Sequence, residues 1–168
     1  YFDHLQAKNP QEPLAIGGNA PLSKTYAYNP VPTELAKDQQ KYILGVQANL
    51  WTEYIATPAK ADYMLLPRML ALAEVAWTPT ANKNFENFSN ERLPHHLAQL
   101  DAKGYNYRVP TAIGASDTTL TGTEFTFDLQ PSVEGEKVNY TIDGYSPRET
   151  DLHVTGPVKI KEKKKKEI

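Results

Sequence analysis

The chain has 168 residues, with 18 basic and 20 acidic side chains, a formal net charge of -2 and no cysteine. This length can hold one domain or two small ones, and the near-neutral charge excludes a global field that would recruit nucleic acid or an anionic membrane. Without cysteine the chain forms no disulfide or thiolate metal site, and no apolar run reaches the roughly 18 residues of a membrane-spanning helix.

The first forty residues predict mostly loop. Residues Tyr1–Gln6 start abruptly, as though within a strand or just beyond one, and Ala7–Ala20 is rich in proline and glycine, which is typical of a loop. Leu22–Pro32 ends in a Pro-x-Pro turn. Thr33 is a suitable N-cap, so we expect a short helix over Glu34–Gln40.

A strand and a helix are predicted next. Tyr42–Val46 has the composition of a short buried strand, and Trp51 and Glu53 follow it, two residues apart. Asp62–Trp77 is rich in Ala, Leu, Met and Glu and predicts a helix, with apolar residues three to four apart at Leu66, Leu70, Ala73 and Trp77. Together they indicate a βα unit. In a barrel, residues at the C-terminal end of the strand point into the active site, where an indole and a carboxylate suit sugar recognition.

The pattern changes after a second helical stretch. Asn84–Gly104 predicts a helix that Pro94 interrupts and Gly104 caps. Beyond it, period-two alternation and threonine enrichment predict short strands of an antiparallel sandwich. We therefore place a boundary at residues 105–114, which gives one domain of residues 1–105 and a second of residues 106–168. The strands are expected at residues 124–129, 137–142, 152–154 and 158–160, and the lysine-rich tail, residues 161–168, is expected to be solvated and disordered.

Four stretches resemble one known family. Gly45–Glu53 has the pattern Gly-x-Gln-x-x-x-Trp-x-Glu, and Arg68–Trp77 has Arg-x-x-Ala-x-Ala-Glu-x-x-Trp. These patterns resemble the last barrel unit of the family 20 glycoside hydrolases, the β-N-acetylhexosaminidases. Tyr1–Asp3 is similar to the Tyr-Leu-Asp that ends another strand of that family. Tyr140–Pro147 resembles a hairpin of the β-sandwich found behind many bacterial members.

The resemblance implies a fold. It makes the chain the C-terminal portion of a (β/α)8 TIM barrel, an α/β fold, followed by an appended all-β sandwich with an immunoglobulin- or fibronectin-like arrangement. A complete barrel typically needs about 250 residues, so we expect a fragment of a longer enzyme. Open barrel edges would expose backbone groups and apolar surface, which predicts self-association or partial disorder of the front segment.

The resemblance also implies a chemistry, namely hydrolysis of terminal β-linked N-acetylglucosamine or N-acetylgalactosamine, in which the substrate's own acetamide attacks the anomeric carbon. An adjacent Asp-Glu pair supplies the acid in that family, and this sequence contains no such dipeptide. The matching positions make Tyr1 the hydroxyl that holds the acetamide, Asp3 and Glu53 acceptors for sugar hydroxyls, and Trp51 the wall against the ring. No cofactor or metal is implied.

Plainer interpretations stay open. Trp51 and Glu53 are also compatible with core packing beside a surface charge, and Tyr1 and Asp3 lie at a chain end where fraying is common. Arg68, Glu74 and Trp77 are interpreted as scaffold behind the barrel, and the histidines as surface residues. The alternative function is a non-catalytic carbohydrate-binding or assembly module, and a free-standing structural protein is a third. Bacterial relatives of this layout are often periplasmic or exposed at the cell surface, which is implied by resemblance only.

Overall fold

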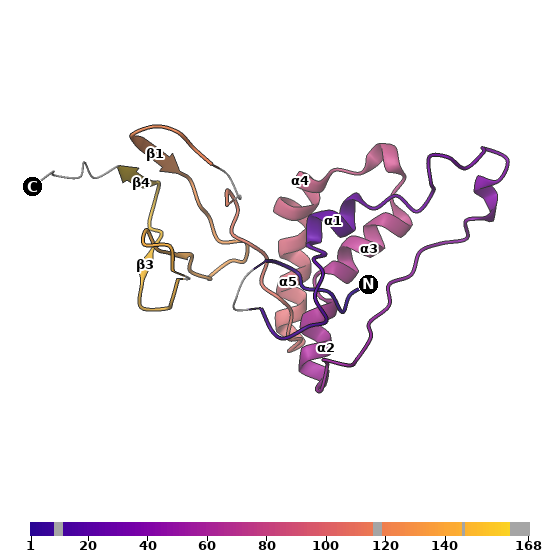
Figure 1. The fold of residues 1–168 in the computed structure, drawn as a ribbon, viewed down its shortest axis with the longest axis horizontal. Helices are drawn as coiled ribbons and strands as arrows, with labels where there is room; N and C mark the ends of the chain where they lie inside the picture. The colour runs from indigo at the N-terminus through magenta and orange to yellow at the C-terminus, as the bar shows by residue number, and fades with distance from the viewer. Residues whose placement is uncertain (9–11, 116–118, 146, 162–168) are drawn as a thin grey trace, which may run out of the picture. The chain divides into compact units, whose positions relative to one another are not determined.

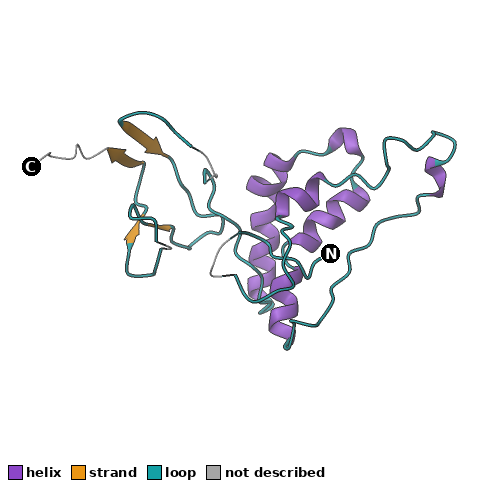
Figure 2. Cartoon of the chain, in the orientation of Figure 1, coloured by secondary structure: helices purple, strands orange, loops and turns teal. Residues whose placement is uncertain are grey.

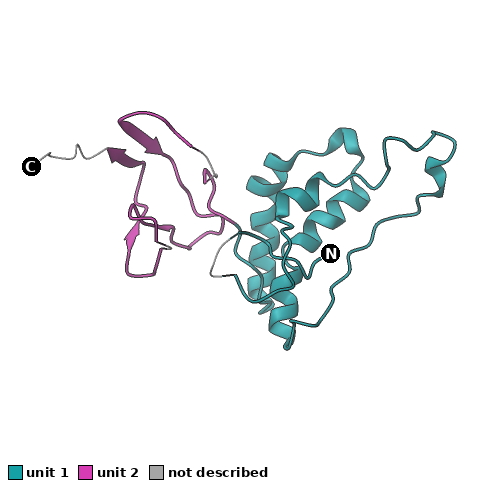
Figure 3. Ribbon diagram, viewed as in Figure 1, with its two compact units in different colours: residues 1–110 teal, residues 111–168 magenta. Residues whose placement is uncertain are grey.

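The computed structural model describes residues 1–8, 12–115, 119–145 and 147–161. Its contacts divide the chain into two compact units, residues 1–110 and 111–168 (Figure 3). The first unit is built from helices and long loops, and the second from short strands (Figure 2). The helices of the first unit are α1 Leu22–Ala27, η1 Gln40–Tyr42, α2 Pro58–Leu65, α3 Arg68–Trp77, η2 Thr80–Asn82, α4 Phe85–Asn87, η3 Phe88–Arg92 and α5 Leu93–Ala102.

The predicted helix over Asp62–Trp77 is present, but it is two helices. Leu66 and Pro67 separate α2 from α3, and Thr57 caps α2 by accepting a 3.2 Å hydrogen bond from the Lys60 backbone. The predicted apolar face was wrong for α3, because the inward residues are Arg68, Ala71 and Val75, at the i, i+3, i+7 spacing of one helix face. Trp77, expected on that face, is 88% exposed.

The predicted second helix is also present. The backbone is helical from α4 through η3 to α5, and Pro94 does not interrupt it. The five residues before α5 form a π-helical turn. Hydrogen bonds in a π-helix span five residues instead of four, and this spacing tolerates the missing backbone N–H of Pro94. Gly104 ends α5 with a φ of +72°, and its N–H donates to Asp101 O while that of Tyr105 donates to Leu100 O. This is a Schellman motif, as expected of a glycine C-cap.

Two predicted elements of the first unit do not form. Residues 34–39 make isolated turns, followed by the single 3-10 turn of η1, where a helix over Glu34–Gln40 was expected. This stretch is largely exposed, and a helix so short gains too little without packing. The predicted strand Tyr42–Val46 is absent as well: residues 43–57 run as a loop from η1 back to α2 (Figure 1). A strand needs a partner ladder, and no described segment provides one here.

The core of the first unit lies among α1, α3 and the α4–α5 helix. Tyr26 of α1 stacks on Phe88, with ring centroids 5.0 Å apart, and its hydroxyl accepts from the Asn84 backbone at 2.9 Å. Glu74 of α3 and Arg92 form a two-pronged ion pair at 2.7 and 2.8 Å. These contacts pack α3 and α1 against the α4–α5 helix.

The second unit has antiparallel pairs where strands were predicted. Its strands are β1 Glu124–Phe127, β2 Asn139–Tyr140, β3 Leu152–His153 and β4 Val158–Lys161. They form two two-stranded sheets, β1 with β4 and β2 with β3. Gly114 is required beside them, because a Cβ there would meet Asp128 O at 2.2 Å. The described residues do not join the two sheets into one, so the larger sandwich stays a prediction.

Candidate functional site

Of the two predicted site residues near the N-terminus, Tyr1 is exposed to solvent and Asp3 is buried. Tyr1 is 66% exposed, and its ring lies 5.9 Å from the His4 ring. Asp3 is only 7% exposed, and its Oδ1 atom has no hydrogen-bond partner. A buried carboxylate oxygen without a donor is uncommon and costly, so the described residues leave the accepting capacity of this atom unused.

Trp51 and Glu53 both lie on the loop of residues 43–57. Trp51 is 54% exposed and Glu53 is exposed as well. Neither side chain is therefore part of the core of the described chain: the exposure of Trp51 disagrees with core packing, whereas that of Glu53 fits a surface charge as well as a site residue. An exposed indole provides a flat apolar surface, and an exposed carboxylate accepts from hydroxyl groups.

One backbone hydrogen bond joins these two regions of the sequence. The Phe2 N–H donates to Asn49 O at 2.7 Å. The N-terminal segment, which contains Tyr1 and Asp3, therefore lies beside the start of the segment that contains Trp51 and Glu53. Within the described chain, no hydrogen bond, ion pair or ring contact links any two of the four side chains. The structure thus brings the two backbones together but does not assemble a closed pocket from the four residues.

Arg68 organises the N-terminal side of this region. It is fully buried at the start of α3 and donates to the carbonyl oxygens of Phe2 at 2.5 Å, of His4 and Ala20 at 3.1 Å each, and of Met64. Its guanidinium carbon lies 4.8 Å from the centre of the Phe2 ring. Burial lowers the pKa of Arg68 to about 10, which the charges of Glu12 and Asp3 partly oppose, so the group is cationic at neutral pH.

A second buried charge cluster fixes the following loop. Glu12 accepts from Arg108 Nε at 2.6 Å and from the Tyr63 hydroxyl at 3.2 Å. Burial, with the Glu12 charge as the next cause, raises the pKa of Tyr63. Sequence analysis missed both clusters. The only signals were Arg68 within a helical motif and an acidic residue in a proline-rich loop, and neither identifies its partner.

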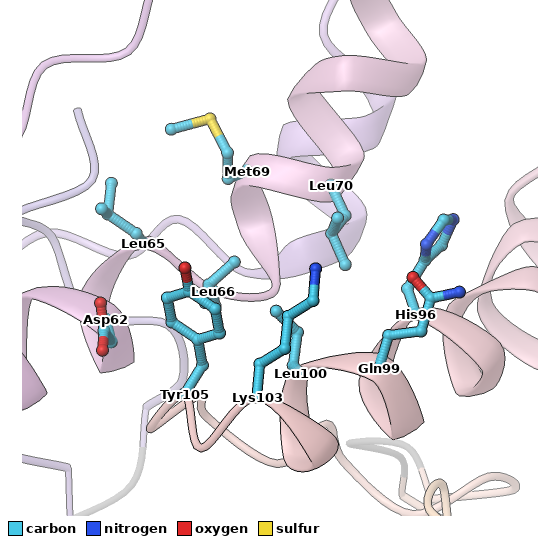
Figure 4. Close-up of a pocket in the computed structure, with 10 residues that line it drawn as sticks. All are labelled: Asp62, Leu65, Leu66, Met69, Leu70, His96, Gln99, Leu100, Lys103 and Tyr105. Atoms are coloured by element: carbon cyan, nitrogen blue, oxygen red, sulfur yellow. The ribbon is translucent and has the colours of Figure 1, made fainter.

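A groove lies among α2, α3 and α5, away from the four predicted residues. Figure 4 shows Lys103 and Tyr105 extending from the end of α5 toward Leu66 and Leu70. Its floor is leucine and methionine, and its rim carries Asp62 and His96, a composition that fits packing as well as binding. In the described part of the chain, no group of His, Asp and Glu side chains is arranged to hold a metal ion. No described helix is long and apolar enough to cross a membrane.

Comparison with known proteins gives a consistent result. Residues 1–80 match the model of the glycosyl hydrolase family 20 catalytic domain. The chain is 41% identical to a β-hexosaminidase of Porphyromonas gingivalis over 162 residues, which are 95% of this chain and 21% of that protein. It is 30% identical to a β-N-acetylhexosaminidase of Cellulomonas fimi over 107 residues, or 64% of this chain and 21% of that protein. The chain therefore spans about a fifth of the length of these curated relatives.

Solved structures agree with the sequence matches. A family 20 exo-β-N-acetylglucosaminidase from Vibrio harveyi, solved with N-acetylglucosamine, superposes with a TM-score of 0.57 at 37% identity over 64% of this chain and 17% of that one. The family 20 β-N-acetylhexosaminidase of Streptomyces coelicolor gives 0.55 at 27% identity, over 64% of this chain and 22% of that one. The chain belongs to glycosyl hydrolase family 20, of whose catalytic domain it holds only a part.

Proposed function

We propose that this chain is part of a β-N-acetylhexosaminidase and supplies one wall of the pocket that binds a terminal N-acetylhexosamine. The observation that carries the proposal is the Phe2–Asn49 hydrogen bond, because it places two segments with sugar-binding residue types side by side. The similarity to the β-hexosaminidases of P. gingivalis and C. fimi supports the same substrate class.

Each side chain has a definite task in this proposal. The Trp51 ring lies against the apolar face of the sugar, and Glu53 accepts from hydroxyl groups far from the cleaved bond. Asp3 accepts from another hydroxyl through its free Oδ1 atom. Tyr1 donates to the carbonyl of the 2-acetamido group and holds that oxygen in line with the anomeric carbon. The acetamide oxygen then attacks, the glycosidic bond breaks, and water opens the cyclic intermediate with net retention.

The acid for this reaction comes from another part of the enzyme. No adjacent Asp-Glu pair occurs in the 168 residues, so nothing here matches the residues that protonate the leaving group in the family. The isolated chain is therefore inactive in this proposal. The longer enzyme completes the barrel around residues 1–105, carries the strands of the second unit within a β-sandwich, and acts in the periplasm or at the cell surface.

Hydrolysis of an aryl N-acetyl-β-glucosaminide tests the proposal. The 168-residue chain should be inactive, and the longer enzyme that contains it should be active. In that enzyme Trp51→Ala and Glu53→Gln should each lower kcat/KM by about 10- to 100-fold, since each removes a polar or apolar contact to the sugar. The matched controls are Trp77→Ala, which removes the other exposed tryptophan, and Glu34→Gln on an exposed turn.

The outcomes separate the alternatives. Controls that lose as much activity as the site variants would attribute the loss to stability rather than to sugar binding. Activity in the 168-residue chain would mean that an acid is present among the residues interpreted as scaffold. No activity in either chain, together with retention on immobilised N-acetylglucosamine, would favour a carbohydrate-binding module.

A further inference from the structure

Arg68 donates hydrogen bonds to backbone carbonyls on both sides of Asp3. The Phe2 carbonyl belongs to the peptide that precedes Asp3, and the His4 carbonyl lies just beyond it; both accept from the Arg68 guanidinium. A third acceptor, Ala20 O, ties the return of the loop to the same group, and Ala20 N–H donates to Leu5 O at 2.8 Å. One side chain from α3 thus fixes residues 2–5 and the far end of their loop.

The hydrogen bonds of Arg68 go to carbonyl oxygens rather than to the neighbouring carboxylate. Asp3 is close enough for its charge to act on Arg68, yet the two side chains form no ion pair. A direct two-pronged pair would occupy the carboxylate oxygens. The two terminal nitrogens of the guanidinium are held by the carbonyls of Phe2, His4, Ala20 and Met64, while Arg68 Nε and Asp3 Oδ1 are both buried without a hydrogen-bond partner in the described chain. Oδ1 of Asp3 therefore keeps its accepting capacity beside a buried positive charge.

We infer that Arg68 is a positioning residue for sugar binding, which holds the Asp3 carboxylate in place and leaves its Oδ1 atom free for a substrate hydroxyl. This inference rests on the proposed function, since it assigns Asp3 to the pocket. Arg68 does not touch substrate; it acts through the Phe2–His4 backbone. The same backbone carries the Phe2 N–H that bonds Asn49 O, so Arg68 also sets the distance between the Asp3 segment and the Trp51 segment.

The test uses the longer active enzyme and a double-mutant cycle. Asp3→Asn should raise KM by about tenfold or more, because an amide replaces a charged acceptor. Arg68→Lys keeps the charge but cannot donate to four carbonyls, and it should lower kcat/KM by about 10- to 100-fold through misplacement of Asp3. If Arg68 acts through Asp3, the double variant should be little worse than the worse single variant.

A structural role alone would give a different pattern. Arg92→Lys is the matched control, since the ion pair of Arg92 with Glu74 also anchors α3 but involves none of residues 1–5. Arg68→Lys and Arg92→Lys should both lower the melting temperature, but only Arg68→Lys should change KM. Losses of Arg68→Lys and Asp3→Asn that multiply in the double variant would overturn the inference and leave Arg68 as scaffold.

A second variant serves if Arg68→Lys does not fold. Phe2→Leu keeps an apolar side chain but removes the ring beneath the guanidinium, and it should raise KM about threefold, non-additively with Asp3→Asn. A Phe2→Leu enzyme with unchanged KM would contradict the inference. Failure of the proposed function gives a different result from failure of this inference. If Asp3 is not part of the pocket, the Asp3→Asn enzyme should bind N-acetylglucosamine and turn over substrate as well as the unmodified enzyme does.

Discussion

At the scale of single residues, three ionisable side chains of the first unit are almost withdrawn from water, and each is stabilised differently. Glu12 has two partners, the Arg108 guanidinium and the Tyr63 hydroxyl. Arg68 has four carbonyl oxygens, and Asp3 has an oxygen with no partner. Burial of a charge is tolerated when hydrogen bonds replace hydration, and both Asp3 Oδ1 and Arg68 Nε depart from this rule, since neither atom has a hydrogen-bond partner among the described residues. A carboxylate oxygen left unpaired in this way is a reasonable ligand-binding position.

Tyr63 gives a prediction about pH. Its pKa is raised above 10.0 first by burial and then by the Glu12 carboxylate, which repels a phenolate. The folded state therefore holds the phenol proton more tightly than the unfolded chain does. This contribution to stability is complete below pH 10 and is lost as pH rises through the folded pKa. Ultraviolet titration, taken as the difference between the unmodified chain and Tyr63→Phe, should show Tyr63 ionising above 10.0.

The role of Glu12 can be isolated in the same titration. Glu12→Gln removes the repelling charge and leaves the Arg108 cation, which lowers the pKa of Tyr63, so that pKa should fall. Glu34→Gln, at an exposed position, should leave it where it was. A Tyr63 pKa that does not respond to Glu12→Gln would mean that burial alone raises it.

At the scale of elements, the helices after residue 57 were predictable, whereas α1 was not predicted and neither the helix Glu34–Gln40 nor the strand Tyr42–Val46 forms. The helices after residue 57 follow from local composition, and both Gly104 and the Thr57 cap act through neighbours a few residues away. The segment Tyr42–Val46 has strand composition, but a strand depends on partners distant in the sequence. The inward face of α3 was mispredicted for the same reason, since the carbonyls that draw Arg68 inward are about 50 to 65 residues away.

The Thr57 cap gives a prediction at this scale. Its hydroxyl accepts from the Lys60 N–H, one of the backbone donors that the first turn of α2 leaves without a helical partner. Thr57→Ala should reduce the free energy of unfolding by about 1 kcal/mol, whereas Thr57→Ser keeps the acceptor and should cost much less. Urea unfolding followed by circular dichroism gives both values, and hydrogen exchange should be faster at Lys60 in the alanine variant. Equal losses for alanine and serine would attribute the effect to the threonine methyl group instead of the cap.

For the candidate site, the sequence predicted which residues to consider but not their burial or hydrogen bonds. Trp51 and Glu53 were found because their spacing matches a family pattern, and the structure shows both as exposed. The burial of Asp3 and its lack of a donor could not be predicted, because they depend on how Arg68 binds the surrounding carbonyls. Sequence reasoning thus proposed the segments of the candidate site, whereas the burial of Asp3 beside Arg68 depends on long-range contacts.

At the scale of the whole molecule, a short chain exposes a large amount of apolar surface. Leu44 is 96% exposed, Trp77 88% and Tyr42 71%, and the loop of residues 43–57 has no strand beside it in the described chain. Contiguous exposed apolar surface usually marks an interface, and Tyr42 and Leu44 are two residues apart in the chain. The relatives are about five times longer than the matched region, so other parts of such an enzyme are available to cover these residues.

The 168-residue chain on its own should therefore self-associate. Sedimentation velocity at increasing concentration should show species larger than the monomer, because burying Leu44 and Tyr42 in a second copy removes them from water. The double variant Tyr42→Ser and Leu44→Ser should shift the distribution toward monomer. Leu120→Ser, which removes one 49% exposed apolar side chain from the second unit, should not. A monomer at every concentration, with slow hydrogen exchange across residues 43–57, would show that the loop is already covered by its own chain. The apolar side chains of the loop would then not be an interface for the rest of the enzyme. The assignment of Trp51 and Glu53 to the proposed pocket would need other evidence.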